Sequence, residues 1–334
     1  MKSRVLSGMR PTGPLHLGHL IGALENWRKL QEKHSCLFMV ADWHALMSEY
    51  ENPSNLNTYA IDNVIDWLSY GIDPHKSIIF RQSDVKEHLD LMMVFSTLTP
   101  LSWLERCPTY KEQLKELKGR ELTTYGFLGY PVLQAADILV YKARYVPVGE
   151  DQLPHLELTR EIGRRFNGLY KKEIFPEPEA LLTQEPRLLG LDNRKMSKSY
   201  GNFIALSDPS DVVRKKVSSM ITDTTKIKKD DPGDPVKHGC NVYAYHKTFG
   251  AGAAVSGALK DLEERCKKGD LGCVECKKLL ADGLVRFLEE KIQKNRDRYT
   301  REDARDILAQ GAHQAHEIAA ETMREVKETL GFAS

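Results

Sequence analysis

The first 85 residues alternate between short apolar runs and amphipathic segments, and this alternation constrains the fold more than any other feature. Apolar runs typical of buried strands lie at residues 5–9, 36–42 and 77–80. Between them, residues 20–32 and 54–68 place apolar side chains at helical spacing. This order predicts an α/β protein with a doubly wound, Rossmann-like parallel sheet. Ligands of such sheets bind at the carboxyl ends of the strands.

The first predicted strand turns through Pro11 and Gly13 directly into a helix that begins with two histidines. His16 and His19 are three residues apart, so they share one face, and Gly18 between them lets a ligand or another backbone approach closely. The free N–H groups and the dipole of a helix N-terminus favour a phosphate. Two histidines at a helix start are otherwise often incidental.

A second polar sequence, Lys-Met-Ser-Lys-Ser, lies far downstream at residues 195–199. Its lysines and hydroxyls are suited to contact a polyphosphate, and a solvated basic loop is the alternative interpretation. Together with the H-x-G-H sequence at residues 16–19, it resembles the paired signatures of class I aminoacyl-tRNA synthetases.

Composition limits the classes of partner. The chain has 334 residues and a formal net charge of +1, so a nucleic acid would have to be bound by local patches. It contains no apolar run of membrane-spanning length and no signal peptide at its start. We therefore expect a cytoplasmic protein with no membrane association and no DNA partner.

The length predicts two domains. We expect a Rossmann-like catalytic domain at residues 1–202 and an α-helical domain at residues 203–334, whose last helix packs back on the catalytic domain. That last helix is predicted to begin after the capping pattern Thr300-x-x-Asp303 and to end at Gly331.

Asp137 lies in a largely apolar segment, residues 130–141, where an unpaired carboxylate would be costly. One interpretation is a salt bridge to Lys142 or Arg144, or a capping role. The other is an acceptor that is reserved for a donor on a ligand.

Two neighbouring segments extend the resemblance. Val-Pro-Val-Gly-Glu-Asp-Gln at residues 146–152 and Ala-Ala-Asp-Ile-Leu at residues 135–139 resemble the tryptophanyl-tRNA synthetases, those of bacteria most closely, and the similarity covers nearly the whole chain. This resemblance implies activation of L-tryptophan with ATP and Mg²⁺ to tryptophanyl-adenylate and pyrophosphate. It further implies transfer to tRNA(Trp), an anticodon-binding role for the helical domain, and a homodimer.

The resemblance also implies roles for individual residues. The catalytic set comprises His16, His19, Lys195, Lys198 and Lys111. The ATP-binding set comprises Arg10, Pro11, Thr12, Gly18, His19, Gly149, Glu150, Asp151, Leu188, Lys195, Met196, Ser197, Lys198 and Ser199, in which residues 149–151 hold the ribose and the backbone near Leu188 contacts adenine. The tryptophan-binding set comprises Asp137, Leu6, Gly8, Tyr130, Gln134, Val146, Val148, Gln152 and His44.

The chain departs from this pattern at a few positions. Many bacterial relatives carry Thr and Asn in place of His16 and His19, Gln in place of Arg10, and Met in place of Gln134. An indole N–H is only a hydrogen-bond donor, so a buried Asp137 suits tryptophan and rejects phenylalanine. Tyrosine is the harder competitor, and a tyrosyl-tRNA synthetase is therefore the alternative function.

Four of the six cysteines, Cys240, Cys266, Cys273 and Cys276, form the pattern C-x25-C-x6-C-x2-C. This clustering predicts a metal site, and four thiolates suit Zn²⁺ or a [4Fe–4S] cluster equally. A subset of bacterial tryptophanyl-tRNA synthetases has similar spacing and carries [4Fe–4S], so the resemblance favours iron–sulfur. A non-catalytic paralogue that uses this site for RNA binding or redox sensing is a further alternative.

Overall fold

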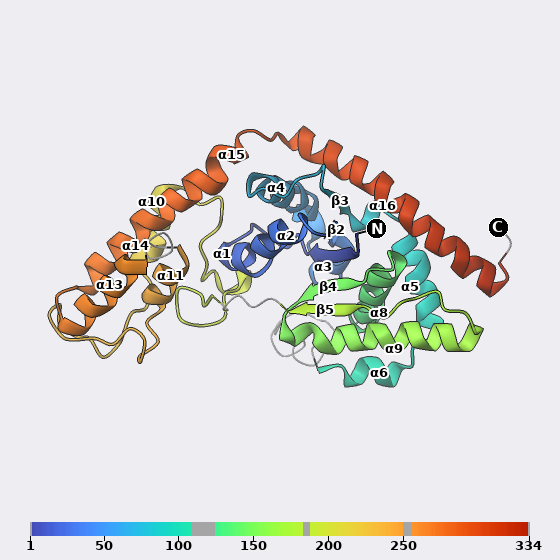
Figure 1. Ribbon diagram of the computed structural model, residues 1–334, viewed down its shortest axis with the longest axis horizontal. Coiled ribbons are helices and arrows are strands. Elements are labelled where there is room, and N and C mark those ends of the chain that lie inside the picture. Colours follow the sequence, from blue (N-terminus) through green and yellow to red (C-terminus); the bar gives the residue numbers. More distant parts are fainter. Residues whose placement is uncertain (1, 109–123, 183–187, 250–255, 333–334) are drawn as a thin grey trace. The chain divides into compact units, whose positions relative to one another are not determined.

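The computed structural model describes residues 2–108, 124–182, 188–249 and 256–332, which belong to two compact units (Figure 1). Unit 1 comprises Met1–Gly13, Asn26–Gln184 and Thr300–Ser334, and unit 2 comprises Pro14–Glu25 and Glu185–Tyr299. These units divide the chain differently from the boundary expected at residue 202. The expected division was one of function, into catalytic and anticodon-binding parts, and it stays a prediction.

Unit 1 contains a five-stranded sheet of order β3-β2-β1-β4-β5, and all its neighbouring strands are parallel. The strands are β1 (Arg4–Met9), β2 (Ser35–Val40), β3 (Ser77–Arg81), β4 (Tyr145–Val148) and β5 (Glu179–Leu182). The three apolar runs of the first 85 residues form β1, β2 and β3, with Leu6 opposite Leu37. The predicted doubly wound α/β class is confirmed. β5 was not predicted.

The helices of unit 1 pack on this sheet or on one another. They are α3 (Asp42–Glu49), α4 (Leu56–Ser69), α5 (Glu87–Leu98), α6 (Leu101–Arg106), α8 (Tyr125–Val140), α9 (Leu153–Tyr170) and α16 (Arg301–Leu330), with short turns at η2 (Pro53–Asn55), η3 (Gln82–Asp84) and η4 (Glu150–Gln152). Trp27, from α2 (Glu25–Leu30), stacks on Phe38 with ring centroids 4.4 Å apart, and Trp67 meets Trp27 edge-on. These fully buried rings contribute much apolar area to the core.

The last helix, α16, covers the edge strand β3 (Figure 1). Its N-terminus has the predicted capping box between Thr300 and Asp303, and Gly331 ends it with a φ of 72°. A Cβ atom on Gly311 would lie 1.9 Å from the carbonyl oxygen of Ile79 in β3. The helix backbone therefore approaches the strand so closely that only glycine fits at this position.

We expect Gly311→Ala to destabilise the protein by about 3 kcal/mol, because the new methyl group would force the helix away from backbone atoms that cannot yield. Chemical denaturation of the full chain would measure the change in the free energy of unfolding. Gly168→Ala is the matched control, since Gly168 lies in α9 and, apart from the backbone of its own helix and its chain neighbours, no described residue has an atom within 4 Å of its Cβ position. That variant should be neutral or stabilised by up to about 1 kcal/mol. Equal effects of the two substitutions would contradict the close approach.

Unit 2 is mainly helical. Its elements are α1 (Leu17–His19), the π-helix η1 (Leu20–Leu24), η5 (Lys198–Tyr200), α10 (Ser210–Ser218), α11 (Asn241–Phe249), α13 (Ser256–Lys268), α14 (Cys273–Leu288), the π-helix η6 (Glu289–Gln293) and α15 (Lys294–Arg296). Residues 14–25 belong to this unit because residues 15–17 bond to a later segment: Leu17 N–H donates to Ile204 O at 3.1 Å, and Leu206 N–H donates to Leu15 O at 2.9 Å. Within the described part of the chain, no helix has the length and apolar character to cross a membrane.

Candidate active site

His16 and His19 lie together at the start of the first helix of unit 2. His16 is the N-cap residue, and its Nδ1 accepts a hydrogen bond from the Gly18 N–H at 3.1 Å. The His16 N–H in turn donates to His19 Nδ1 at 3.2 Å, and the two ring centroids are 3.8 Å apart. A π-helical turn follows directly, a feature often found beside functional sites.

These contacts fix the protonation of both imidazoles. Burial, and secondarily the nearby Lys198 ammonium, lower the pKa of His16 to about 3, and burial together with His16 and Lys198 lowers the pKa of His19 well below its ordinary value. Both rings are therefore neutral near pH 7. Because each Nδ1 accepts a backbone N–H, the ring proton is on Nε2. Each histidine thus has an Nε2–H to donate.

The Lys-Met-Ser-Lys-Ser loop lies against this helix start. The Sδ of Met196 would be 3.1 Å from a Cβ on Gly18, and Lys198 is close enough to His16 to lower its pKa. Asn202 holds the loop, because its side chain donates to Lys195 O at 3.1 Å and accepts from the Ser197 N–H at 2.9 Å. The H-x-G-H and Lys-Met-Ser-Lys-Ser sequences are therefore neighbours within unit 2. Sequence reasoning missed Asn202.

The other residues of the expected ATP-binding set are distributed over both units. In unit 1, Arg10, Pro11 and Thr12 form a turn after β1, and Gly149, Glu150 and Asp151 form the turn between β4 and α9. In unit 2, Leu188 precedes a short bridge between Leu189 and Lys195, and Ser199 lies in η5. Lys111 lies outside the described residues.

Asp137 is the centre of a buried polar network in unit 1. Its Oδ1 accepts from Gln82 Nε2 at 2.7 Å and from His88 Nδ1 at 2.6 Å, and its Oδ2 accepts from His44 Nε2 at 2.7 Å. Burial raises the pKa of Asp137, but the hydrogen bonds from His44 and His88 outweigh it and lower the pKa to about 2. The carboxylate is therefore ionised and accepts only.

The salt bridge to Lys142 or Arg144 that one interpretation of Asp137 proposed is not formed. Lys142 instead pairs with Glu325 at 2.7 Å, and Arg144 lies 3.4 Å from Glu179. Both lie in polar surroundings near the surface, where long basic side chains keep their charge hydrated. The buried carboxylate is satisfied by neutral and histidine donors.

A second network joins two residues of the expected tryptophan-binding set. The Tyr130 hydroxyl is 2.7 Å from His155 Nε2, and His155 Nδ1 is 3.0 Å from Gln152 Oε1. Burial lowers the pKa of His155 to about 4, so its ring is neutral and accepts from Tyr130 while it donates to Gln152. His155 therefore orders both side chains. An isolated histidine in a helix gives no local signal for such a role.

The remaining residues of that set also lie in unit 1. Leu6, Val146 and Val148 are buried members of the core beside the sheet. Gly8 is packed closely, because a Cβ there would lie 3.1 Å from Met39 Cε. Gln134 is half-buried on α8, one turn before Asp137. The structure thus connects His44 with Asp137, and Tyr130 with Gln152.

Cys240, Cys266, Cys273 and Cys276 line one cavity in unit 2. The thiols are all free, and burial raises the pKa of Cys276 to about 12. Among the described residues, no group of three or more His, Cys, Asp or Glu side chains has the geometry to hold a metal ion. The donor set nevertheless fits such a group by its chemistry, since four thiols are the ligands that Zn²⁺ and iron–sulfur clusters take.

Polar groups surround this cavity. Burial raises the pKa of Asp223, but hydrogen bonds from Thr225 and His238 outweigh it and hold the pKa well below its ordinary value. The buried Lys226 donates to Leu271 O at 2.9 Å. A Cβ on Gly233 would lie 3.0 Å from Cys266 Sγ, so glycine leaves room beside this thiol.

The neutral state of His16 is testable by imidazole NMR. We expect its ring resonances, assigned by their loss in His16→Gln, to stay constant between about pH 8 and pH 5 and to show the Nε2–H tautomer, whereas the urea-unfolded chain titrates near a pKa of about 6.5. Because the unfolded chain binds a proton there that the folded chain does not, this histidine makes stability fall as the pH falls from about 6.5 toward the folded pKa. A folded-state midpoint near 6.5 would contradict the burial argument.

Comparison with known sequences and solved structures shows the family to which this chain belongs. Residues 1–289 match the family described as class I tRNA synthetases for tryptophan and tyrosine. A tryptophan–tRNA ligase of Thermotoga maritima is 51% identical over 98% of this chain and 99% of its own length, and one of Aquifex aeolicus is 44% identical over 98% and 100%. The crystal structure of a Campylobacter jejuni tryptophanyl-tRNA synthetase with ADP and tryptophan has a TM-score of 0.87 at 35% identity, covering 98% of this chain and 100% of that one. The chain therefore belongs to the class I tRNA synthetases for tryptophan and tyrosine.

Proposed function

We propose that this chain is a tryptophan–tRNA ligase, which activates L-tryptophan with ATP to tryptophanyl-adenylate and pyrophosphate and then transfers tryptophan to the 3′ end of tRNA(Trp). The observation that carries the proposal is the similarity to tryptophan–tRNA ligases over nearly their full length and the full length of this chain. Tyrosyl-tRNA synthetase is the alternative within the family.

The first step is an attack of the tryptophan carboxylate on the α-phosphate, which releases pyrophosphate. The carboxylate is already ionised at pH 7, so the protein needs no side-chain nucleophile. It must instead position the reactants and stabilise negative charge on the phosphates. In this proposal the Nε2–H groups of His16 and His19 donate to phosphate oxygens, and Lys195 and Lys198 supply positive charge. Lys111 is assigned to the same task by resemblance alone.

The remaining contacts with ATP follow the expected set. By resemblance, Gly149, Glu150 and Asp151 are assigned to the ribose, the backbone near Leu188 is assigned to adenine, and residues 10–12 complete the ATP-binding set. Mg²⁺ accompanies ATP on its phosphates, as is usual for this ion, and neutralises part of their charge. Arg10 stands where many relatives carry Gln, and it adds positive charge to the phosphate end of this set.

We assign the recognition of tryptophan to residues of unit 1. Asp137 accepts the indole N–H, and Tyr130 and Gln152, which His155 holds, face the polar end of the amino acid. Leu6, Gly8, Val146 and Val148 contribute the apolar wall, with Gln134 and His44 beside it. Support comes from the buried ionised state of Asp137 and from the two hydrogen-bonded networks.

Pyrophosphate–ATP exchange tests the reaction and the pocket together. We expect exchange that depends on tryptophan, and we expect Asp137→Asn to raise the KM for tryptophan by at least about tenfold with little change in the KM for ATP. The reason is that a hydrogen bond to a charged acceptor contributes roughly 1.5–3 kcal/mol. Exchange with tyrosine alone would overturn the specificity, and equal losses for both substrates would remove Asp137 from the pocket.

The four cysteines are part of the proposal as ligands of a [4Fe–4S] cluster, with Zn²⁺ as the alternative. Cys273 and Cys276 lie three residues apart at the start of α14, and Cys240 and Cys266 come from the segments before α11 and near the end of α13. When bound, such a group would join these segments covalently and add to the stability of unit 2. Their shared cavity supports this assignment.

Anaerobically purified protein should show broad thiolate–iron absorbance at about 400 nm and contain about four irons per chain. Cys276→Ser should lower the metal content and the unfolding temperature, whereas Cys107→Ala, at a buried cysteine outside the cavity, should leave the metal content unchanged. A colourless protein with about one zinc per chain would replace the cluster by Zn²⁺. A protein without metal would reject both.

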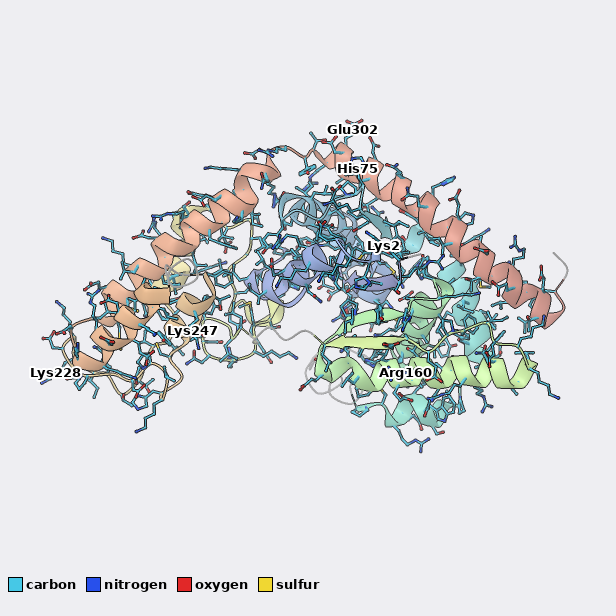
Figure 2. All side chains as sticks on the ribbon, viewed as in Figure 1. Lys2, His75, Arg160, Lys228, Lys247 and Glu302 are labelled. Atoms are coloured by element: carbon cyan, nitrogen blue, oxygen red, sulfur yellow. The ribbon has the colours of Figure 1, made fainter. Side chains whose placement is uncertain are left out.

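Binding of tRNA is assigned to basic side chains of unit 2. Figure 2 shows Lys228 at the outer edge of this unit, and Lys247 is exposed on α11. Near the cysteines, Lys277 donates to Ser218 O at 2.9 Å, while Lys267 pairs with Glu263 at 2.7 Å. The net charge of the whole chain is only +1, so overall charge does not attract tRNA. Local groups of basic side chains such as these would contact the tRNA phosphates instead.

A homodimer completes the proposal. Unit 1 exposes large apolar side chains on α5, α6 and α8, namely Leu89, Met93, Leu101 and Tyr125, of which Met93 is 67% and Tyr125 is 75% exposed. A contiguous group of exposed apolar side chains is typical of a surface that another chain covers, and these four side chains are our candidates for such a surface. A cytoplasmic location follows from the proposed reaction and remains a prediction.

A further inference from the structure

We propose that His88 is a positioning residue that contributes to the amino-acid specificity of this site. Its ring is held by a hydrogen bond to the Tyr141 hydroxyl. Together with Gln82 and His44, it directs its hydrogen-bond donor to Asp137, so that a bound ring meets an acceptor at the carboxylate. This inference rests on the proposed contact between Asp137 and the indole N–H.

The hydrogen-bonding capacity of Asp137 is nearly filled. An ionised carboxylate has about four acceptor positions. Gln82 and His88 occupy the two on Oδ1, and His44 occupies one on Oδ2. One position on Oδ2 therefore remains for a ligand donor. The three bonds come from α3, η3 and α5, so they fix both the position and the rotation of the carboxylate.

His88 is itself fixed from the opposite side. Its ring is fully buried, its Nε2 is 2.8 Å from the Tyr141 hydroxyl, and it stacks on Phe80 with centroids 6.0 Å apart. Whichever protonation state the ring adopts, Nδ1 is the donor toward the ionised Asp137. A flip of the ring would lose both hydrogen bonds at once, so Tyr141 holds the Nδ1–H in place.

Gln82 adds a second acceptor. Its Nε2 donates to Asp137, and its Oε1 is buried without a hydrogen-bond partner among the residues that the structure describes. The amide cannot rotate without losing the bond to the carboxylate. The acceptors left over in this network are thus Asp137 Oδ2 and Gln82 Oε1.

This arrangement discriminates between aromatic amino acids. An indole N–H is donor-only and leaves nothing unsatisfied when it bonds to an acceptor. A phenol hydroxyl also donates, but its oxygen must in addition accept, and the N–H groups that His44 and His88 present here are already bonded to Asp137. A buried, unsatisfied oxygen lowers affinity by roughly tenfold or more. The residues that hold these donors on Asp137 therefore contribute to the rejection of tyrosine.

The test compares tryptophan with two other amino acids in pyrophosphate–ATP exchange. One is tyrosine, and the other is 3-benzothienylalanine, in which sulfur replaces the indole N–H; a poor substrate is measured as a competitive inhibitor. We expect His88→Ala to reduce the preference for tryptophan over each competitor by roughly tenfold, with an unchanged KM for ATP. His88→Asn, which keeps an N–H near the position of Nδ1, should recover most of the preference.

Tyr141→Phe removes only the hydroxyl and keeps the packing of a buried ring, so it tests the inference even where His88→Ala does not fold. It should lower the tryptophan preference by roughly threefold. Equal losses for tryptophan and 3-benzothienylalanine in the His88 and Tyr141 variants would show that these residues only support the fold, and would overturn the inference.

The Asp137→Asn variant separates this inference from the proposed function. If the wild-type preference for tryptophan over 3-benzothienylalanine survives in Asp137→Asn, then the assignment of Asp137 to the indole N–H fails. If Asp137→Asn abolishes the preference while His88→Ala and Tyr141→Phe retain it, then only the positioning role of His88 fails.

Discussion

Burial of the ionised Asp137 carboxylate is the constraint that organises unit 1. A carboxylate in an apolar interior must be surrounded by donors, and those that contact it come from α3, η3 and α5, while Asp137 itself lies on α8. These elements are joined by a carboxyl group as well as by apolar packing. Its hydrogen bonds more than offset the cost of burial, which is why its pKa falls to about 2.

Much of the fold could be predicted from the sequence, because many of its elements have local sequence signals. Apolar runs bounded by turns predicted β1, β2 and β3, and the Thr300–Asp303 pattern predicted the start of α16. β5 could not be predicted, since its four residues are exposed or half-buried at a sheet edge. The contact of Gly311 with Ile79 could not be predicted either, because the close approach of a helix to a strand leaves no local pattern in the sequence.

The polar residues follow the same rule. Asp137 was conspicuous because it interrupts an apolar segment, and the four cysteines because they are clustered along the chain. His88 and His155 are each single polar residues in ordinary surroundings, and only the fold brings them to Asp137, Tyr130 or Gln152. The four cysteine ligands can be identified from the sequence, but the identity of the metal cannot, because four thiolates suit both zinc and an iron–sulfur cluster.

Histidines perform two opposite tasks in this protein, and a fixed partner decides which. At the helix start of unit 2, backbone N–H bonds to Nδ1 of His16, and the backbone of His16 bonds to Nδ1 of His19, so each ring keeps its Nε2–H to donate. In unit 1, the ionised Asp137 takes the N–H of His44 and of His88, so an acceptor remains. Donors suit phosphate oxygens, and an acceptor suits an indole N–H. Histidine is therefore used for two substrates of opposite hydrogen-bonding character. At the helix start it offers a donor to phosphate, and around Asp137 it leaves an acceptor for the indole, because the neighbours of each ring decide which nitrogen donates.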